Sequence, residues 1–547
     1  MGGCTVLTEH LDRIRAHLKP EGDLKRAFSQ IWPRITQSCR DALTREAERY
    51  FNLPIPVWTA TEMLRGAPNY HQSYAMRRQM LAAFVMCACV HDTDLYDARI
   101  FDLVWAICEE SSWALCGGES LPVRENPYTR EAAETAALLS WANCLAYKAI
   151  WRMSSSLDGR IRREITRRVS DPVSKNMEFP TSDPAVLSPL LVAVLLSEQD
   201  SPRRWGAVRR LAYWMEEGIG RLYSPSIDIW QEAGGHFMDA LTILYFATGN
   251  EIDLRRMLRS FSTMPLIANL SGNWWVNPGE RSMQSAPSGA ALYRFGRGTG
   301  NDQLRALGAK LFRMEAPLSH PENMTGRVLS AMYEADIDRE SLRPGSLPSG
   351  SPAGSSLAVA RVERFTAAIH AGDPSSIHCD AGDLSLFFRG RPVFFDLGSG
   401  HHSTGAHNLP SIDSQGQLPG GKIAFLESQI RHDAHYLSAD IAESYPDRLG
   451  LETWQRTVML PFDRCEVRII EMFGFAREKH NIEFHFITPE MPSLEETYAV
   501  IGELVLEWER GLVPSVENLG SAWRINLSID RPVRSGNATF IIRPVEN

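Results

Sequence analysis

The sequence lacks the features of a membrane protein and of a disulfide-rich secreted protein. Its longest apolar run, 80–90, is only about half of the ~20 residues that a transmembrane helix needs. Residues 1–19 contain charged side chains early and no apolar signal-peptide core. Nine cysteines in 547 residues are too few for a disulfide framework, and most stand in apolar stretches typical of buried thiols. We therefore expect a cytoplasmic protein that has no membrane partner.

The sequence also lacks an excess of positive charge. Lys and Arg number 57 against 66 Asp and Glu, which gives a formal net charge of -9. Such a chain has no general electrostatic attraction for nucleic acid, so nucleic acid is not an expected partner. Apolar residues make up 44% of the chain and charged residues 22%, which favours folded domains with sizeable cores over disorder.

The hydrophobic period divides the chain in two. Across 1–340, apolar residues recur at three- and four-residue spacing, which predicts helices joined by short loops. Asp183 followed by Pro184 is a typical helix start, with an N-cap and a proline in the first turn. Residues 341–356 are rich in Ser, Gly and Pro and read as a linker. From 357 to 547 the period changes to two, which predicts stacked antiparallel sheets.

The densest group of chemically active side chains lies within 375–413. Its members are His378, Asp380, Asp383, Asp396, His401, His402, His407 and Asp413. Asp396 ends the apolar strand 392–395, and His407 lies in the loop that follows. Imidazole and carboxylate groups from adjacent strands can form a three-ligand zinc site with an open fourth position. The alternative is that several of these histidines cap turns in a solvated loop.

A second group lies on one face of a predicted helix within 226–245. Glu232, His236 and Asp239 are spaced at i, i+4 and i+7, so their side chains share a face. Such a polar stripe near the start of a helix is suited to lining a sugar-binding cleft. The alternative is a capped helix whose charged residues face water.

Three tryptophans are candidates for contact with a sugar. Trp230 comes directly before the polar helix face, and Trp274 and Trp275 are adjacent in the chain. Indole rings stack on sugar rings, so we predict substrate binding by Trp230, Trp274 and Trp275, together with Asp239. For the adjacent pair, packing in the core is the favoured alternative.

Several segments resemble the heparinase II/III-like proteins. Residues 378–400 are similar to that family's HxDxGSF-strand-DxG segment, and 406–413 to its HNT-x-x-x-D segment. In the helical half, the segments 107–118, 181–196 and 231–244 are similar to the family's E-x-x-W-x-x-P-x-H, NNWNAV and EGxGYWxYG motifs, in that order. The resemblance spans roughly 40–545.

The resemblance implies a fold and an activity. The family's fold is an incomplete (α/α) toroid followed by an antiparallel β-sandwich. Its members are polysaccharide lyases, which cleave glycans containing uronic acids by β-elimination. We therefore expect an acidic oligosaccharide or polysaccharide as substrate. The family's zinc ligands correspond to His378, Asp396 and His407, which implies one bound zinc ion.

The family's catalytic positions agree less well. Ser182 stands in the asparagine position, His236 in the tyrosine position, and Ser376 where the family has a further histidine. Histidine can replace tyrosine in proton transfer because its ordinary pKa is near 6.5. The resemblance thus implies that His236 is the acid or base, that Glu232 orients it, and that Ser182 occupies the remaining catalytic position.

These departures leave three functions open. The first is a lyase that pairs His236 with Tyr223 or Tyr245, in a cleft between toroid and sandwich. The second is a glycoside hydrolase, with Glu232 and Asp239 as its two carboxylates. The third is a catalytically degenerate protein that binds carbohydrate without cleaving it.

Overall fold

The structure is a computed structural model of the chain. It describes residues 6–15, 18–116, 126–175, 180–219, 226–249, 255–276, 278, 282–315, 323–352, 356–372, 377–398 and 400–545. The chain forms two compact units. The helical unit consists of Met1–Arg221, Gln231–Leu258 and Ser288–Pro344. The β unit consists of Leu222–Trp230, Arg259–Pro287 and Gly345–Asn547.

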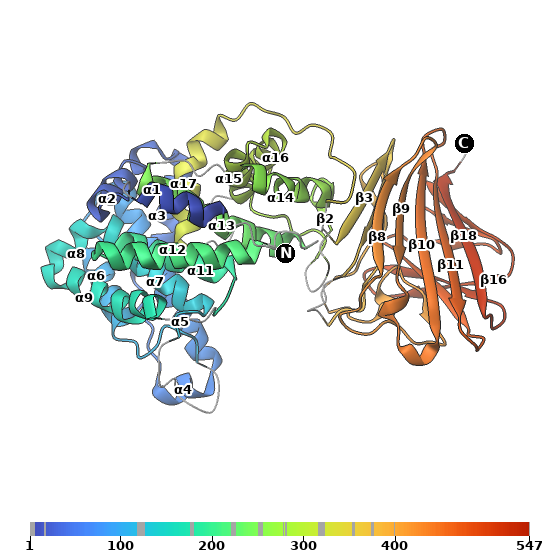
Figure 1. Cartoon of the computed structure of the whole chain (residues 1–547), viewed down its shortest axis with the longest axis horizontal. Coiled ribbons are helices and arrows are strands. Elements are labelled where there is room, and N and C mark those ends of the chain that lie inside the picture. The colour runs from blue at the N-terminus through green and yellow to red at the C-terminus, as the bar shows by residue number, and fades with distance from the viewer. Residues whose placement is uncertain are drawn as a thin grey trace. The chain divides into compact units, whose positions relative to one another are not determined.

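Helices occupy the N-terminal part of the chain (Figure 1). They are α1 (Val6–Ile14), α2 (Glu21–Ser29), α3 (Gln37–Phe51), α4 (Ala60–Arg65), α5 (Pro68–His91), α6 (Asp97–Cys108), α7 (Arg130–Leu145), α8 (Tyr147–Met153), α9 (Ser155–Ile165), α10 (Asp171–Lys175), α11 (Pro184–Ser197), α12 (Ser201–Glu217), α13 (Ile227–Thr248), α14 (Arg255–Ala268), α15 (Gly289–Thr299), α16 (Asp302–Met314) and α17 (Met324–Asp338). Among the described helices, none is both long and apolar enough to cross a membrane. The described cysteines are all free thiols, and most are buried, as predicted.

The helical unit contains a helix that is buried on every side and a helix that is buried on one side only. Every residue of α11 is buried, which suits an apolar sequence placed between other helices. By contrast, α3 buries only one face, which carries Cys39, Leu43, Ala47 and Tyr50. The predicted start of α11 is confirmed, because the Asp183 carboxylate accepts a hydrogen bond from the backbone N–H of Ala185 at 3.0 Å.

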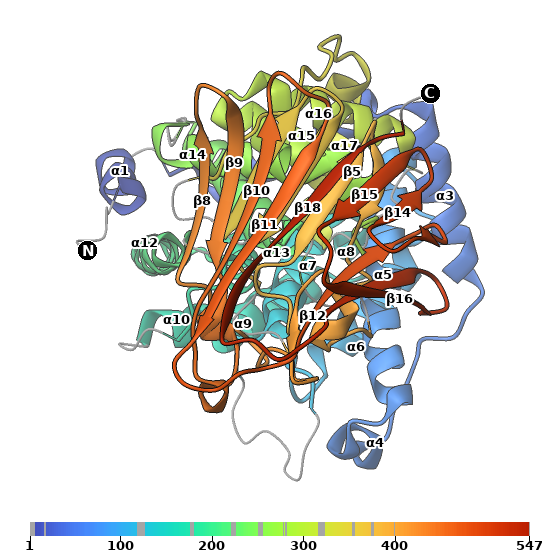
Figure 2. The ribbon, with the colours of Figure 1, turned by 90° about the vertical axis from the view of Figure 1, so that its right-hand side faces the viewer.

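Strands dominate the C-terminal part, and every strand pair is antiparallel. They are β3 (Leu357–Val362), β4 (Phe365–His370), β5 (Leu384–Phe388), β6 (Arg391–Phe394), β7 (Ser411–Ile412), β8 (Phe425–Ile430), β9 (Ala434–Asp440), β10 (Leu451–Pro461), β11 (Val467–Phe475), β12 (Ile482–Thr488), β13 (Ser493–Leu494), β14 (Tyr498–Ile501), β15 (Leu504–Trp508), β16 (Leu512–Asn518), β17 (Trp523–Ile529) and β18 (Ser535–Pro544). The largest sheet has the order β13-β14-β15-β18-β11-β10-β9-β8, and four of its strands, β8 to β11, lie side by side in Figure 2. Two smaller sheets have the orders β16-β17-β12-β7 and β3-β4-β5-β6. One apolar core joins residues of all three sheets, including Phe365, Trp454, Phe484 and Phe540. The predicted order of a helical toroid followed by an antiparallel β-sandwich is confirmed.

The border between the units is more elaborate than one linker. Part of the Ser/Gly/Pro segment is held to β3, because Gly350 and Val359 exchange two backbone hydrogen bonds of 2.8 and 2.9 Å. Residues 259–287, which include β1 (Asn269–Ser271) and β2 (Trp274–Trp275), also belong to the β unit. The Arg361 guanidinium of β3 fixes this segment by donating to the carbonyls of Ile267 and Asn269 at 2.9 and 2.8 Å.

A buried ion pair ties the large sheet to the loop before β5 and to the loop between β6 and β7. The Arg456 guanidinium on β10 donates to the Glu471 carboxylate on β11 at 2.7 Å. It also donates to the carbonyls of Gly382 and Asn408 at 2.9 and 2.6 Å. The Trp454 indole N–H donates to the second oxygen of Glu471 at 2.7 Å. Arg456 thus anchors both loops that carry the histidine and aspartate cluster.

We expect Arg456→Met to lower the free energy of unfolding of the β unit by about 3–5 kcal/mol, because Glu471 would keep a buried charge without its cation. Equilibrium denaturation measures this loss. The control is Arg543→Met, since the Arg543–Glu507 pair on the same large sheet is only partly buried and such pairs contribute about 0–1 kcal/mol. Equal losses in the two variants would contradict the role given to Arg456.

Candidate functional site

Strand ends of the β unit bring buried imidazoles and carboxylates together. His370 ends β4, and Asp383 comes directly before β5. Antiparallel pairing places Ile369 opposite Leu384, so His370 and Asp383 are neighbours. Asp396 follows β6, and His407 follows a short turn of 3-10 helix. These four side chains are all buried.

His407 and Asp396 form the centre of this cluster. The Nδ1 atom of His407 lies 3.0 Å from the Asp396 carboxylate, which also accepts the Gly398 N–H at 2.9 Å. Burial alone lowers the pKa of His407, but the charge of Asp396, with Asp383 and Asp380 nearby, raises it to about 9. Burial raises the pKa of Asp396, and His407 brings it below its ordinary value. The Nε2 atom of His407 is buried and has no hydrogen-bond partner among the described residues.

Asp383 is held in place from one side only. Its Oδ1 atom accepts the backbone N–H of Asn408 at 2.6 Å. Its buried Oδ2 atom has no hydrogen-bond partner in the described part of the chain and lies 3.9 Å from Nε2 of His370. Burial, together with the charge of Asp396, raises the pKa of Asp383. The Asn408 amide donates to the carbonyls of Leu384 and Phe395 at 2.8 and 3.2 Å. Asn408 therefore fixes the strand ends on which Asp383 and Asp396 lie.

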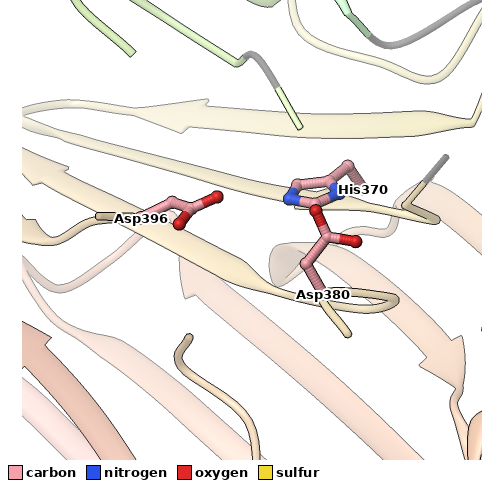
Figure 3. Close-up of side chains that lie close together, drawn as sticks. All are labelled: His370, Asp380 and Asp396. Atoms are coloured by element: carbon pink, nitrogen blue, oxygen red, sulfur yellow. The ribbon is translucent and has the colours of Figure 1, made fainter. Parts of the chain in front are cut away.

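Two overlapping groups have the donor atoms and spacing that a metal ion requires. Ligand atoms of Asp383, Asp396 and His407 lie within 4.8 Å of one another. His370 and Asp380 form a second such group with Asp396, and Figure 3 shows the side chains of His370 and Asp380 close together. Imidazole with carboxylate is a donor set that zinc accepts. The buried Oδ2 of Asp383 has no hydrogen-bond partner among the described residues, and a cation that displaces the proton of His407 would meet the lone pair of its buried Nε2.

His370 is the weaker ligand of these two groups. Its Nδ1 atom accepts the Gly372 N–H at 3.1 Å. Gly372 has φ +74°, a conformation that glycine adopts without strain. A neutral imidazole that accepts at Nδ1 carries its proton at Nε2, where the lone pair for a metal would have to be. The group that contains His407 is therefore the better candidate for a metal site.

The structure places His378 beside the cluster but in neither metal group. Its Nε2 atom lies 3.1 Å from Nδ1 of His402, and its ring centre is 5.9 Å from that of His407. Of the three predicted ligands, Asp396 and His407 come together. Asp383 joins them from the predicted segment, and sequence reasoning missed His370. The available signal was an apolar strand that ends in histidine eight residues before the first histidine of the HxDxG segment.

His236 is the central candidate of the helical unit. It lies on α13 with only 9% of its surface exposed, and its Nδ1 atom is 3.2 Å from Nδ2 of Asn323. Burial, aided by the positive charges of Arg130 and Arg294 and opposed by Asp183, lowers the pKa of His236 to about 4. The imidazole is therefore neutral at pH 7. Sequence reasoning missed both Asn323 and Arg130.

The predicted acidic partners of His236 are paired with arginines. Glu232 forms an ion pair with Arg130, the first residue of α7. Asp239 is buried and lies 3.2 Å from the Arg294 guanidinium. In the structure Glu232 forms its ion pair with Arg130 and not with His236. Glu232 therefore acts on the imidazole of His236 only by way of the Arg130 guanidinium.

The other predicted catalytic residues are placed as follows. Ser182 is half-buried directly before the N-cap of α11, and its backbone leaves no room for a Cβ atom on Gly218. Tyr245 is 43% exposed and stands nine residues after His236 on α13. Nine residues correspond to two and a half turns and about 13 Å, so the two side chains leave opposite sides of the helix. Tyr223 and Ser376 lie outside the described residues.

The tryptophans predicted to contact substrate are packed against protein. Trp230 and Trp275 have no exposed surface, and the Trp230 indole N–H donates to the carbonyl of Phe261 at 3.1 Å. Trp274 packs edge-on against Phe387 and Phe395, with ring centres 5.6 and 6.1 Å away. Core packing, the favoured alternative for Trp274 and Trp275, describes these rings in the structure.

We expect acid to destabilise the protein through His236. Its pKa is 6.5 in the unfolded chain and about 4 in the folded protein, so the unfolded state binds more protons between these values. Stability therefore falls as the pH drops from about 7 to 4, by up to about 3 kcal/mol. Denaturation curves at pH 7 and pH 4 should show that the free energy of unfolding falls less in His236→Gln than in the native protein. An unchanged fall in His236→Gln, equal to that of a variant of the exposed His432, would contradict a neutral buried His236.

Comparison with solved structures adds three neighbours. A variant of heparan sulfate lyase HepC from Pedobacter heparinus superposes with a TM-score of 0.57 and 13% identity, over 87% of this chain and 77% of that one. A chondroitin AC lyase variant from Streptomyces coelicolor A3 superposes with a TM-score of 0.60 and 13% identity, over 97% of this chain and 83% of that one. A heparinase III superposes with a TM-score of 0.55 and 13% identity, over 95% of this chain and 93% of that one.

Sequence comparison adds nothing to this likeness. No protein-family model matches the chain, and no curated protein matches it in sequence. At 13% identity, agreement with solved structures concerns the course of the backbone and not the chemistry of the site. The order of a helical unit followed by antiparallel sheets is the same in the sequence prediction, the structure and the neighbours. The chain has the fold of the heparinase-like polysaccharide lyases.

Proposed function

We propose that this protein is a polysaccharide lyase that cleaves glycans containing uronic acids by β-elimination. The observation that carries the proposal is the neutral imidazole of His236, held by the Asn323 amide near Arg130, in a fold shared with three lyases. Those three are named for heparan sulfate, heparin and chondroitin, which are acidic polysaccharides. An acidic oligosaccharide or polysaccharide is the corresponding substrate here.

The proposed chemistry needs groups that respond to the sugar carboxylate. In β-elimination, a base takes the proton next to the carboxylate, a carbon–carbon double bond forms, and the bond to the 4-linked oxygen breaks as that oxygen takes up a proton. The carbon proton becomes acidic only when the carboxylate's growing negative charge is stabilised. Arg130 lies at the N-terminus of α7, where the helix dipole adds positive potential. We assign binding of the sugar carboxylate to Arg130 and His236 of the helical unit.

A zinc ion is part of the proposal. Asp383, Asp396 and His407 would hold it, with His378 beside them, in place of the predicted set of His378, Asp396 and His407. Two buried atoms support this assignment. Nε2 of His407 and Oδ2 of Asp383 have no hydrogen-bond partner within the described residues. When bound, the ion would offset the charge of the buried carboxylates and fix the ends of β5 and β6. A cleft shared by this cluster and His236 stays a prediction.

A glycoside hydrolase is the second candidate, for a specific reason. Glu134 and Glu232 both contact Arg130, with Glu134 at 3.0 Å. Burial raises the pKa of Glu134, as a general acid requires. Asp239, the carboxylate that the sequence paired with Glu232, is instead engaged by Arg294. A hydrolase would therefore use Glu134 and Glu232.

The test is digestion of a panel of acidic polysaccharides, including heparan sulfate and chondroitin sulfate. A lyase produces an unsaturated sugar that absorbs in the ultraviolet, and each cleavage adds one chromophore. Reducing ends without the chromophore would favour the hydrolase. Binding without any product, by zinc-loaded folded protein across the whole panel, would favour the degenerate carbohydrate-binding protein.

A further inference from the structure

We propose that Asn323 is a positioning residue that fixes the proton of His236 on Nε2, so that His236 acts as a hydrogen-bond donor to the substrate carboxylate. The catalytic part of this inference rests on the proposed lyase function. It differs from the role expected from the sequence, in which His236 transfers a proton. In this role the Nε2–H of His236 would stabilise the carboxylate, the task that the resemblance assigns to an asparagine where this chain has Ser182.

The orientation of the Asn323 amide follows from two hydrogen bonds. Asn323 is the N-cap of α17, and its Oδ1 atom accepts the Gly326 N–H at 2.9 Å. The other end of the amide, which faces His236, must therefore be the NH2 group. An NH2 group only donates, so Nδ1 of His236, 3.2 Å away, must accept. The helix cap thus determines which end of the amide meets the imidazole.

The protonation of the ring follows in turn. A neutral imidazole has one N–H, and Nδ1 presents its lone pair to Asn323, so the proton is on Nε2. The groups that act electrostatically on the ring are Arg130, Arg294 and Asp183, and burial outweighs all three in favouring the neutral form. Nε2 has no hydrogen-bond partner among the described residues, which leaves its N–H available.

A neutral Nε2–H suits charge stabilisation better than proton transfer. As a base, the ring would have to accept its proton at the occupied Nδ1 lone pair. As an acid, it would have to become an imidazolate. As a hydrogen-bond donor it loses no proton, and it can stabilise the negative charge that grows on the carboxylate when the carbon proton leaves. Neutral histidines in other enzymes polarise carbonyl groups in this way.

The experiment replaces the side-chain amide of Asn323 with a carboxylate, in the variant Asn323→Asp. Asp caps a helix as well as Asn, so Asn323→Asp keeps the cap of α17. A carboxylate only accepts, so Nδ1 of His236 must become protonated to face it. Nitrogen NMR of protein labelled in histidine, with the signals assigned by His236→Gln, reports which ring nitrogen carries the proton. We expect the proton on Nε2 alone in the native protein and a protonated Nδ1 in Asn323→Asp. Turnover at saturating substrate should fall about 10²-fold in the variant, because the new carboxylate adds negative charge beside the group that binds the substrate carboxylate.

The matched control is Asn301→Asp. Asn301 caps α16 in the same way, accepting the Leu304 N–H at 3.0 Å. This variant should keep the His236 signals and the turnover of the native protein. A proton on Nδ1 of His236 in the native protein would overturn the inference, whether or not Asn323→Asp folds. If the native protein has the proton on Nε2 but eliminates no glycan, the proposed lyase function fails while the hydrogen-bond assignment stands.

Discussion

His236→Ala should reduce kcat/KM for the cleaved glycan about 10²–10³-fold, the loss seen when one donor to a developing oxyanion is removed. The expected loss is chiefly in kcat, because the hydrogen bond strengthens as charge moves onto the carboxylate. The ring is neutral above about pH 5, so its removal should leave the pH profile near 6.5 unchanged. Initial rates of unsaturated product formation, measured over a range of pH, test all three statements.

His432→Ala is the control for this substitution, since the His432 side chain is 95% exposed and lies in the β unit. It should retain full activity. If His236→Ala keeps native kcat/KM, the imidazole is not part of the reaction. If the native profile shows an inflection near pH 6.5 that His236→Ala removes, the ring transfers a proton, contrary to the role assigned here.

Asp396→Ala should abolish metal binding by the β unit and lower its thermal stability. The substitution removes the carboxylate common to both metal groups and leaves His407 without its partner. A ligand present at about 1,000 times its Kd stabilises the folded state by about 4 kcal/mol, so the apo and zinc-loaded native proteins should differ by several degrees. Elemental analysis after purification should find one zinc per native chain and almost none in Asp396→Ala.

Asp413→Ala is the matched control for the metal site. Asp413 also pairs with a histidine, His480, at 2.7 Å, and it lies in the same 375–413 segment, but it belongs to neither metal group. It should keep the zinc content of the native protein. If the native protein takes up no zinc when zinc is supplied, or if the two variants lose it equally, Asp383, Asp396 and His407 do not form a metal site.

Much of the fold could be predicted from the sequence because its signals are local. The unbroken apolar run of α11 after Asp183 and Pro184 predicts a buried helix with a defined start, and the structure confirms it. The change of period after 357 likewise predicts strands. The assignment of 259–287 to the β unit depends on Arg361, about 90 residues away, which donates to the carbonyls of Ile267 and Asn269. No local pattern reports such a contact.

The site was predictable only in part, for the same reason. Asp396 and His407 stand at the end of a strand and in its following loop, so spacing and resemblance both point to them. Asn323 is 87 residues from His236 and, in the sequence, is only an N-cap. The two meet because packing brings the start of α17 to α13. That contact determines the imidazole tautomer, and with it the change from proton transfer to hydrogen-bond donation.

Digestion of a glycan of defined length in water labelled with heavy oxygen tests the central claim most directly. Elimination adds no water, so the account predicts an unsaturated product without the label, formed by the native protein and nearly lost in His236→Ala. A saturated product that carries one heavy oxygen at the new reducing end, isolated before that oxygen exchanges with water, would contradict the account, because hydrolysis adds solvent oxygen there and elimination does not.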